Sequence, residues 1–268
     1  MNNNTTIVTA LFDIGRDEWD TFTMSYNTYL FWMANTLSLD CNMVIYTEKK
    51  FKERITTYRS IVDPTLSKTK IIITTVSEIH TYKQFNNQLE QLMYSDNFKA
   101  KSAWNNVPEM TKPLYNIIMF SKLWFLEDTL KNNYFDNQKF LIWADAGGLR
   151  EDIKQYTNIV WPDESKIDSD NITFFSHHST ISIHDKQSHA ISQMRFIQGT
   201  CFIVPAKLVT EFYNGFNEIV ESCISQEYIG SDEKLLDFYY LSNSNKCKLI
   251  KCDWREYYKI LQKDLAST

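Results

Sequence analysis

Glycine is scarce in this chain, with 6 residues in 268 against the roughly 7% of an average protein. A chain that uses so little glycine is expected to keep it where the backbone must adopt a shape that other residues cannot. Five of the six lie in segments that stand out for other reasons, namely Gly15, Gly147, Gly148, Gly199 and Gly230. They indicate where a tight turn or a close ligand is expected.

Paired cysteines and long apolar runs are also missing. The 5 cysteines are scattered and form no C-x-x-C pair, which favours reduced core thiols over a disulfide framework or a zinc site. No apolar run approaches the ~20 residues that span a bilayer, and the first residues lack a secretory signal. We therefore expect a cytoplasmic protein without a transmembrane segment, and leave peripheral membrane association open.

Several classes of nucleotide-handling protein lose support as well. The net charge is -5 and no basic block stands out, which argues against nucleic-acid binding. Neither G-x-G-x-x-G nor G-x-x-x-x-G-K-[ST] occurs, so Rossmann dehydrogenases and P-loop NTPases are disfavoured. What is present is 43% hydrophobic and 15% aromatic residues, the composition of a packed globular protein.

The hydrophobic pattern alternates between strand and helix in the first half. Strands are expected at 6–12, 42–46, 71–75 and 140–145, and helices at 17–37, 49–58, 78–94 and 114–130, with a loop over 95–112. The helix after the first strand would be capped by Asp17 and bury Trp19 and Phe22. Such alternation predicts βαβ units and a mainly parallel sheet.

The second half contains strands at 171–176, 196–204 and 248–250, a helix opened by Pro205, another from Asp232, and a C-terminal helix. No repeat or flexible linker is found. We therefore predict one α/β domain over residues 1–268, with a nucleotide-binding half (1–150) and a substrate-binding half (151–268).

Residues 140–148 carry the clearest functional signal. An apolar run delivers Asp145 and two glycines to the carboxyl end of a buried strand, the position where open α/β sheets bind ligands. A carboxylate there suits a divalent cation and, through it, the phosphates of a nucleotide. A turn or helix-capping aspartate is the alternative.

Two cations are candidates for phosphate binding. Arg16 follows the first strand and either pairs with phosphate or forms a surface salt bridge. Lys122 precedes the central strand and either neutralises a diphosphate or lies on a solvated helix face. Asn116 lies on the same helix, but the spacing places it on another face.

The histidines cluster as His177, His178, His184 and His189 without zinc-site spacing. They suggest a loop that supplies one metal ligand or phosphate contact, or else ordinary surface histidines. Gln198 and Gly199 interrupt an apolar strand, which often marks a close ligand. Asp232 and Glu233 begin a helix, either as capping acids or as a base near a sugar hydroxyl.

Residues 8–16, 39–40, 43–48 and 143–147 together resemble the HtrL/YibB family, bacterial glycosyltransferase-like proteins linked to surface-polysaccharide genes. The resemblance spans residues 6–240, and its first block is the most specific. It implies a GT-A-like Rossmann-type sandwich with a mainly parallel central sheet, which binds a sugar nucleotide.

The resemblance also implies roles for residues. Asp145 would hold Mn²⁺ or Mg²⁺, but Gly147 stands where a second aspartate is usual, so His184 is the predicted second ligand, or else metal dependence is weak or lost. Gln198 and Gly199 would line the acceptor side, and Asp232 and Glu233 would form the catalytic acidic pair. The residues expected around the nucleoside and its diphosphate are Thr9, Phe12, Asp13, Arg16, Thr47, Glu48, Asn116 and Lys122.

The sequence therefore predicts a metal-assisted glycosyltransferase that moves a sugar from a UDP-linked donor to a hydroxyl of a surface glycan, as in lipopolysaccharide or capsule synthesis. One alternative is an inactive protein of the same fold that binds sugar nucleotides or glycans, favoured by the missing second aspartate. Another is a sugar nucleotidyltransferase, disfavoured because no glycine- and lysine-rich loop follows the first strand. The sugar, the acceptor and the oligomeric state stay open.

Overall fold

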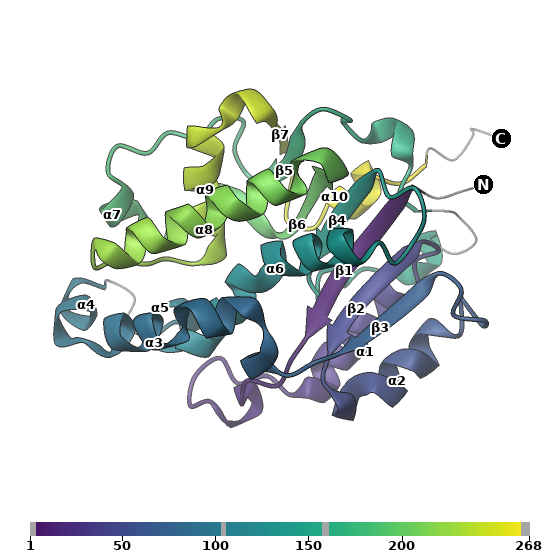
Figure 1. Ribbon diagram of the computed structural model, residues 1–268, viewed down its shortest axis with the longest axis horizontal. Helices are drawn as coiled ribbons and strands as arrows, with labels where there is room; N and C mark the ends of the chain where they lie inside the picture. The colour runs from purple at the N-terminus through teal and green to yellow at the C-terminus, as the bar shows by residue number, and fades with distance from the viewer. Residues whose placement is uncertain (1–3, 103–105, 157–160, 264–268) are drawn as a thin grey trace.

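A single mixed sheet organises the chain (Figure 1). The computed structural model describes residues 4–102, 106–156 and 161–263. Its strands lie in the order β3-β2-β1-β4-β6-β5-β7, with bounds β1 Thr5–Leu11, β2 Asn42–Thr47, β3 Thr69–Ile73, β4 Phe140–Ala144, β5 Ile172–Ser176, β6 Ile197–Pro205 and β7 Cys247–Lys251. Only the pairings of β6 with β4 and β5 are antiparallel. The predicted α/β class with a mainly parallel sheet is confirmed.

Helices cover both faces of this sheet. Successive strand residues point to opposite faces, so Ile7 belongs to one buried cluster and Val8 to the other. The cluster of Val8 includes α3, α6, α8 and α9, whereas the cluster of Ile7 includes α1, α2 and α10. The helix bounds are α1 Tyr26–Leu37, α2 Lys49–Arg59, α3 His80–Tyr94, α4 Asp96–Lys101, α5 Pro108–Thr111, α6 Pro113–Asn132, α7 Lys186–Ala190, α8 Val209–Ser225, α9 Asp232–Ser242 and α10 Tyr257–Ile260.

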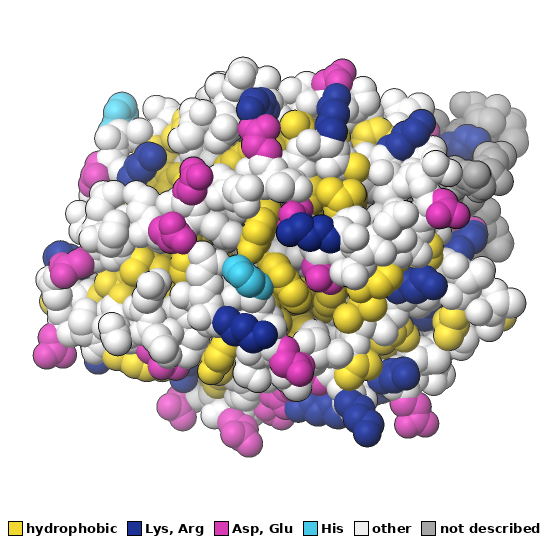
Figure 2. All heavy atoms as spheres, viewed as in Figure 1, with side chains coloured by type: hydrophobic (Ala, Val, Ile, Leu, Met, Phe, Trp, Pro, Cys, Tyr) yellow, Lys and Arg dark blue, Asp and Glu magenta, His cyan; other side chains and the backbone are white. Residues whose placement is uncertain are grey.

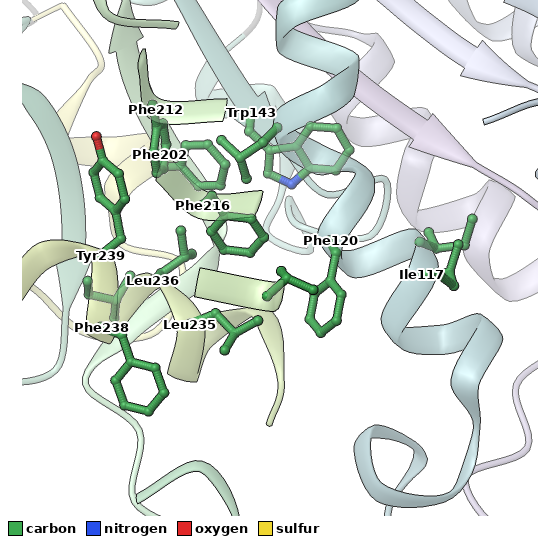
Figure 3. Close-up of a cluster of buried hydrophobic side chains, with 14 of the residues drawn as sticks. Ile117, Phe120, Trp143, Phe202, Phe212, Phe216, Leu235, Leu236, Phe238 and Tyr239 are labelled. Atoms are coloured by element: carbon green, nitrogen blue, oxygen red, sulfur yellow. The ribbon is translucent and has the colours of Figure 1, made fainter. Parts of the chain in front are cut away.

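Aromatic packing joins α6, α8 and α9 to the sheet (Figure 3). Phe120 of α6 meets Phe216 of α8 with ring centroids 6.1 Å apart, and Phe212 of α8 meets Tyr239 of α9 at 4.5 Å. Phe212 also contacts Phe202 of β6 edge-on. This packing sets the positions of α6 and α9 relative to β4 and β6.

The first helix begins later than predicted. A 3-10 turn at Arg16–Glu18 is followed by irregular chain in which Phe22 is 51% exposed with φ 58°, and α1 starts at Tyr26. Its cap is Ser25, whose side chain accepts a hydrogen bond from the Thr28 amide. Capping by Asp17 is therefore wrong, because Ser25 offers the better-placed cap.

Three smaller predictions also differ from the structure. Residues 95–112 contain α4 and α5 instead of a continuous loop, because Ser95 caps α4 and Pro108 occupies the first turn of α5. Pro205 ends β6, and α8 begins only after a 3-10 turn at Ala206–Leu208. The charge and amide content of residues 78–94 predicts an exposed helix, but α3 buries Phe85, Leu89 and Met93.

Two general expectations can be compared with the described residues. All five cysteines are free, and four of them are buried, in agreement with reduced core thiols. Among the residues that the structure describes, no helix has the length and apolar character needed to cross a bilayer. The division of the domain at residue 150 stays a prediction.

Candidate active site

A cavity of about 250 Å³ lies where the strand order reverses. From β1 the sheet continues through β2 to β3 on one side, and on the other side its neighbour is β4. Phe12 follows β1, Asp145 follows β4, and both line the cavity, together with residues of α6 and α9. Open α/β sheets bind ligands at such a switch point beyond the strand ends.

A buried ammonium group joins three elements at the cavity floor. Lys122 of α6 is 1% exposed, and its Nζ lies 3.0 Å from Asp145 Oδ1 and 2.6 Å from Asp232 Oδ2. It also donates a hydrogen bond of 2.8 Å to the carbonyl of Gly199. Burial lowers the pKa of Lys122, but the two carboxylates outweigh it and raise that pKa above its ordinary value. Lys122 therefore stays charged.

The other side of the cavity carries a second carboxylate pair. Glu233 lies 3.1 Å from an Arg195 nitrogen, and Arg195 also lies 3.3 Å from Glu109. Burial and the neighbouring charge of Asp232 raise the pKa of Glu233 to about 7 in spite of Arg195. A carboxyl with this pKa can accept a proton near neutral pH.

The close contact between β6 and the start of α9 explains the glycine in this strand. A Cβ atom at Gly199 would lie 2.5 Å from Asp232 Oδ2 and 3.0 Å from Glu233 Cγ. A larger residue at this position would therefore require Asp232 to move. The sequence signal of a strand glycine thus reflects close approach of another element of the chain.

Three further arginines line the cavity: Arg16, Arg150 and Arg255, called the arginine triad. Arg16 lies 5.3 Å from the ring of Tyr29, and Arg150 lies 3.5 Å from the ring of Trp32. Within the described residues, no carboxylate forms an ion pair with any of the three. By contrast, acidic and basic side chains are interspersed over the face shown in Figure 2.

The predicted site residues fall into two groups. Those that line the cavity are Phe12, Arg16, Lys122, Asp145, Gly199, Asp232 and Glu233. Those that do not are Thr9, Asp13, Thr47, Glu48, Asn116, Gln198 and His184. For both groups, the assignment as ligand-binding residues stays a prediction. The contacts of the second group show how its residues stabilise the fold.

Asp13, Thr47 and Glu48 hold the turn after β1. The Asp13 amide donates to Glu48 at 2.7 Å, and the Asp13 carboxylate accepts from the amide of Gly15 and pairs with Lys50. The Thr47 hydroxyl donates to the carbonyl of Leu11. These contacts position the turn that carries Arg16. Thr9 is buried within β1.

Asn116 and Gln198 support residues that line the cavity. Asn116 donates a 2.8 Å hydrogen bond to the carbonyl of Glu109. The Gln198 amide group donates to the carbonyls of Cys252 and Asp253, and its oxygen accepts from the Arg255 amide, all at 3.2 Å. Gln198 therefore holds the segment that carries Arg255.

The predicted metal site finds little support in this arrangement. His184 is exposed and does not line the cavity, and among the described residues no three His, Cys, Asp or Glu side chains gather as metal ligands. Asp145 Oδ1 already accepts from Lys122 and from Trp143 Nε1, at 3.0 and 2.6 Å. The residues around Asp145 thus do not fit a bound divalent ion as they stand.

The prediction from sequence missed several residues of the cavity. Arg150 follows β4, Arg195 precedes the antiparallel β6, and Arg255 follows β7. All three lie in turns at the same edge of the sheet as Arg16, so the strand-end rule that selected Arg16 could have found them. Glu109, which is presented by α5, had no such signal.

A comparison with known protein families assigns the chain to one of them. The family model HtrL_YibB, a bacterial protein of unknown function, matches residues 3–263. The chain belongs to the HtrL_YibB family. This member is also similar to Protein HtrL of Escherichia coli (strain K12), with 25% identity over 160 residues, which cover 55% of this chain and 52% of that protein. The match thus spans about half the length of its curated relative.

Solved structures that align with this chain have little sequence identity with it. The galactosyltransferase LgtC, in complex with donor and acceptor sugar analogues, aligns with a TM-score of 0.48 and 10% identity, over 91% of this family member and 72% of that chain. The 4-diphosphocytidyl-2C-methyl-D-erythritol synthase of Anaerococcus prevotii DSM 20548 aligns with a TM-score of 0.43 and 10% identity, over 94% and 90%. Identities this low say nothing about activity.

Proposed function

We propose that this protein is a glycosyltransferase, which binds a nucleotide-sugar donor in the cavity beyond β1 and β4 and moves the sugar to a hydroxyl of a glycan. The observation that carries the proposal is one cavity with cations for a leaving diphosphate beside carboxylates for an acceptor hydroxyl. A UDP-linked hexose, a surface-polysaccharide acceptor and a cytoplasmic location are finer parts of the proposal and come from the sequence.

The residues of the cavity suggest how transfer would proceed. The bond between the sugar carbon and the diphosphate oxygen breaks, the acceptor oxygen bonds to that carbon, and its proton passes to a carboxylate. Glu233 suits the role of base, because its raised pKa of about 7 lies near neutral pH. Asp232 is held by Lys122 at 2.6 Å and would position the acceptor.

Charge that develops on the leaving diphosphate needs a cationic partner. The arginine triad lines the cavity and offers such charge, whereas the ammonium group of Lys122 is already bound by Asp145, Asp232 and the Gly199 carbonyl. The family resemblance assigns this role to Mn²⁺ or Mg²⁺ at Asp145, which stays a prediction, and none of the steps above depends on that ion.

The test incubates the protein with a panel of sugar nucleotides and glycan acceptors. Sugar transfer is measured as the amount of nucleoside diphosphate released. We expect Glu233→Gln to lower turnover by roughly 10²- to 10⁴-fold, the usual contribution of a general base, and to keep donor affinity. Glu211→Gln is the control, since Glu211 is an exposed residue of α8 that pairs with Lys246.

Other outcomes would select the alternatives. A donor that binds without transfer to any acceptor would favour a catalytically inactive binding protein, a reading supported by the ammonium group that Lys122 places between Asp145 and Asp232. Release of pyrophosphate from a nucleoside triphosphate and a sugar phosphate would favour a sugar nucleotidyltransferase.

A further inference from the structure

The position of Lys122 bears on how a diphosphate is neutralised in this cavity. Its Nζ lies between two carboxylates, at 3.0 Å from Asp145 and 2.6 Å from Asp232, where a cation bridging both acids would lie. The carbonyl of Gly199 is its third oxygen partner, at 2.8 Å. A fixed ammonium group thus takes the place expected for a bound cation.

The arginine triad supplies further positive charge around this centre. Its members come from three separate segments, after β1, after β4 and after β7. All three line the same cavity, and burial together with the charges of Arg255 and Arg16 lowers the pKa of Arg150. Like charges held together without a carboxylate partner indicate an anionic ligand.

Local contacts hold the triad in position. Arg16 lies between the rings of Trp19, Tyr29 and Tyr115, at 5.3 to 5.6 Å. Arg150 donates from its Nε to the carbonyl of Gly147 at 3.0 Å, and within the part of the chain that the structure describes its two outer nitrogens form no hydrogen bond. The Nε of Arg255 is buried and has no hydrogen-bond partner among the described residues. A buried donor of this kind is costly unless a ligand satisfies it.

The chemistry of these groups favours a diphosphate over a single carboxylate. Guanidinium groups bind phosphate oxygens in a bidentate manner, and three of them can contact both phosphates of one ligand. A lone carboxylate has only two oxygens, so it would leave at least one of the three guanidinium groups without a bidentate anionic partner.

We propose that the arginine triad neutralises the donor diphosphate while Lys122 occupies the place of a cation between Asp145 and Asp232, so that donor binding needs no divalent metal ion. This inference rests on the proposed function for the statement that the ligand is a sugar nucleotide. That the cavity binds an anion follows from the arginine triad alone. It replaces the metal ion implied by the family resemblance with cations of the chain itself.

The experiment measures binding by isothermal titration calorimetry to the full chain, with uridine diphosphate, inorganic pyrophosphate and uridine as probes. Each is titrated once in excess EDTA and once in Mn²⁺. We expect both diphosphates to bind with the same affinity in the two conditions, and uridine to bind far more weakly. Affinity should fall as the salt concentration rises, because the attraction is ionic.

Arg150→Gln is the main variant, since Arg150 is exposed and its loss should not prevent folding. It should weaken both diphosphates about tenfold, which corresponds to one charge-assisted contact. Arg54→Gln is the matched control, because Arg54 is likewise exposed and lies over an aromatic ring, that of Tyr58 on α2, but does not line the cavity. It should bind as the unaltered chain does.

Two results would overturn the inference. Diphosphate binding that appears only with Mn²⁺ would show that a metal ion is needed, while the proposed transferase would stand. Pyrophosphate affinity unchanged by Arg150→Gln would show that the triad does not bind the anion. Conversely, metal-free diphosphate binding without sugar transfer would support the inference and refute the proposed function.

Discussion

Glu233 is a buried carboxyl group beside a second carboxyl group, that of Asp232, at the start of α9. Burial and the charge of Asp232 raise its pKa from the ordinary 4.5 to about 7. Between these two values the folded chain keeps a proton that the unfolded chain has lost. The contribution of Glu233 to stability is therefore present below pH 4.5 and lost as the pH rises to about 7.

Glu233→Gln should remove this pH dependence, because a glutamine does not titrate. We expect the difference in unfolding free energy, variant minus unaltered chain, to be larger at pH 8 than at pH 5. Urea unfolding at both pH values measures the difference. Parallel stability profiles for the two proteins would mean that Glu233 titrates normally in the folded state.

The helix α1 illustrates how a single cap decides where an element begins. Both Asp17 and Ser25 are chemically suited to be caps, but only Ser25 accepts a hydrogen bond from an amide of α1, that of Thr28. The chain between them folds back, with the Tyr26 hydroxyl accepting from the amides of Ile14 and Arg16. Helix α1 therefore also stabilises the turn that carries Arg16.

Ser25→Ala should destabilise the protein by about 1 kcal/mol, the usual cost of removing a helix cap. Asp17→Ala should change the stability by less than about 0.5 kcal/mol, as for other exposed positions. Chemical denaturation of the two variants tests the comparison directly. Equal losses for both would contradict the helix start at Tyr26.

The whole molecule brings together side chains from distant parts of the chain. Gln198 on β6 binds the backbone of residues 252, 253 and 255, more than fifty positions away. It thereby connects the middle of the sheet to the segment that follows β7. The cavity is complete only when this segment is held in place.

Gln198→Ala should release that segment, because two carbonyls and the Arg255 amide lose their partner. We expect a loss of about 1–3 kcal/mol in stability, the range for buried groups left unpaired, and weaker uridine diphosphate binding. Hydrogen exchange of the Arg255 amide should become faster. Gln226→Ala, on an exposed residue after α8, is the control and should change none of these. Unchanged exchange at Arg255 would show that Gln198 does not hold the segment.

Most of the elements could be predicted from local pattern. Strands β1, β2 and β4 and helix α6 occur within about two residues of their predicted bounds, and α9 begins at Asp232 as predicted, because apolar periodicity records which face each element buries. The start of α1 was missed because Asp17 and Ser25 both suit a cap, and α4 and α5, with 6 and 4 residues, are too short to show an apolar period.

The sequence by itself determined the order of the elements, the α/β class and the strand ends that carry Arg16 and Asp145. The tertiary structure alone decided which charges meet. Lys122 contacts Asp232, 110 residues away, and no periodicity encodes such a contact, because it depends on how α6 and α9 pack across the sheet. For the same reason, only the structure shows that Asp145 pairs with the ammonium group of Lys122 on α6.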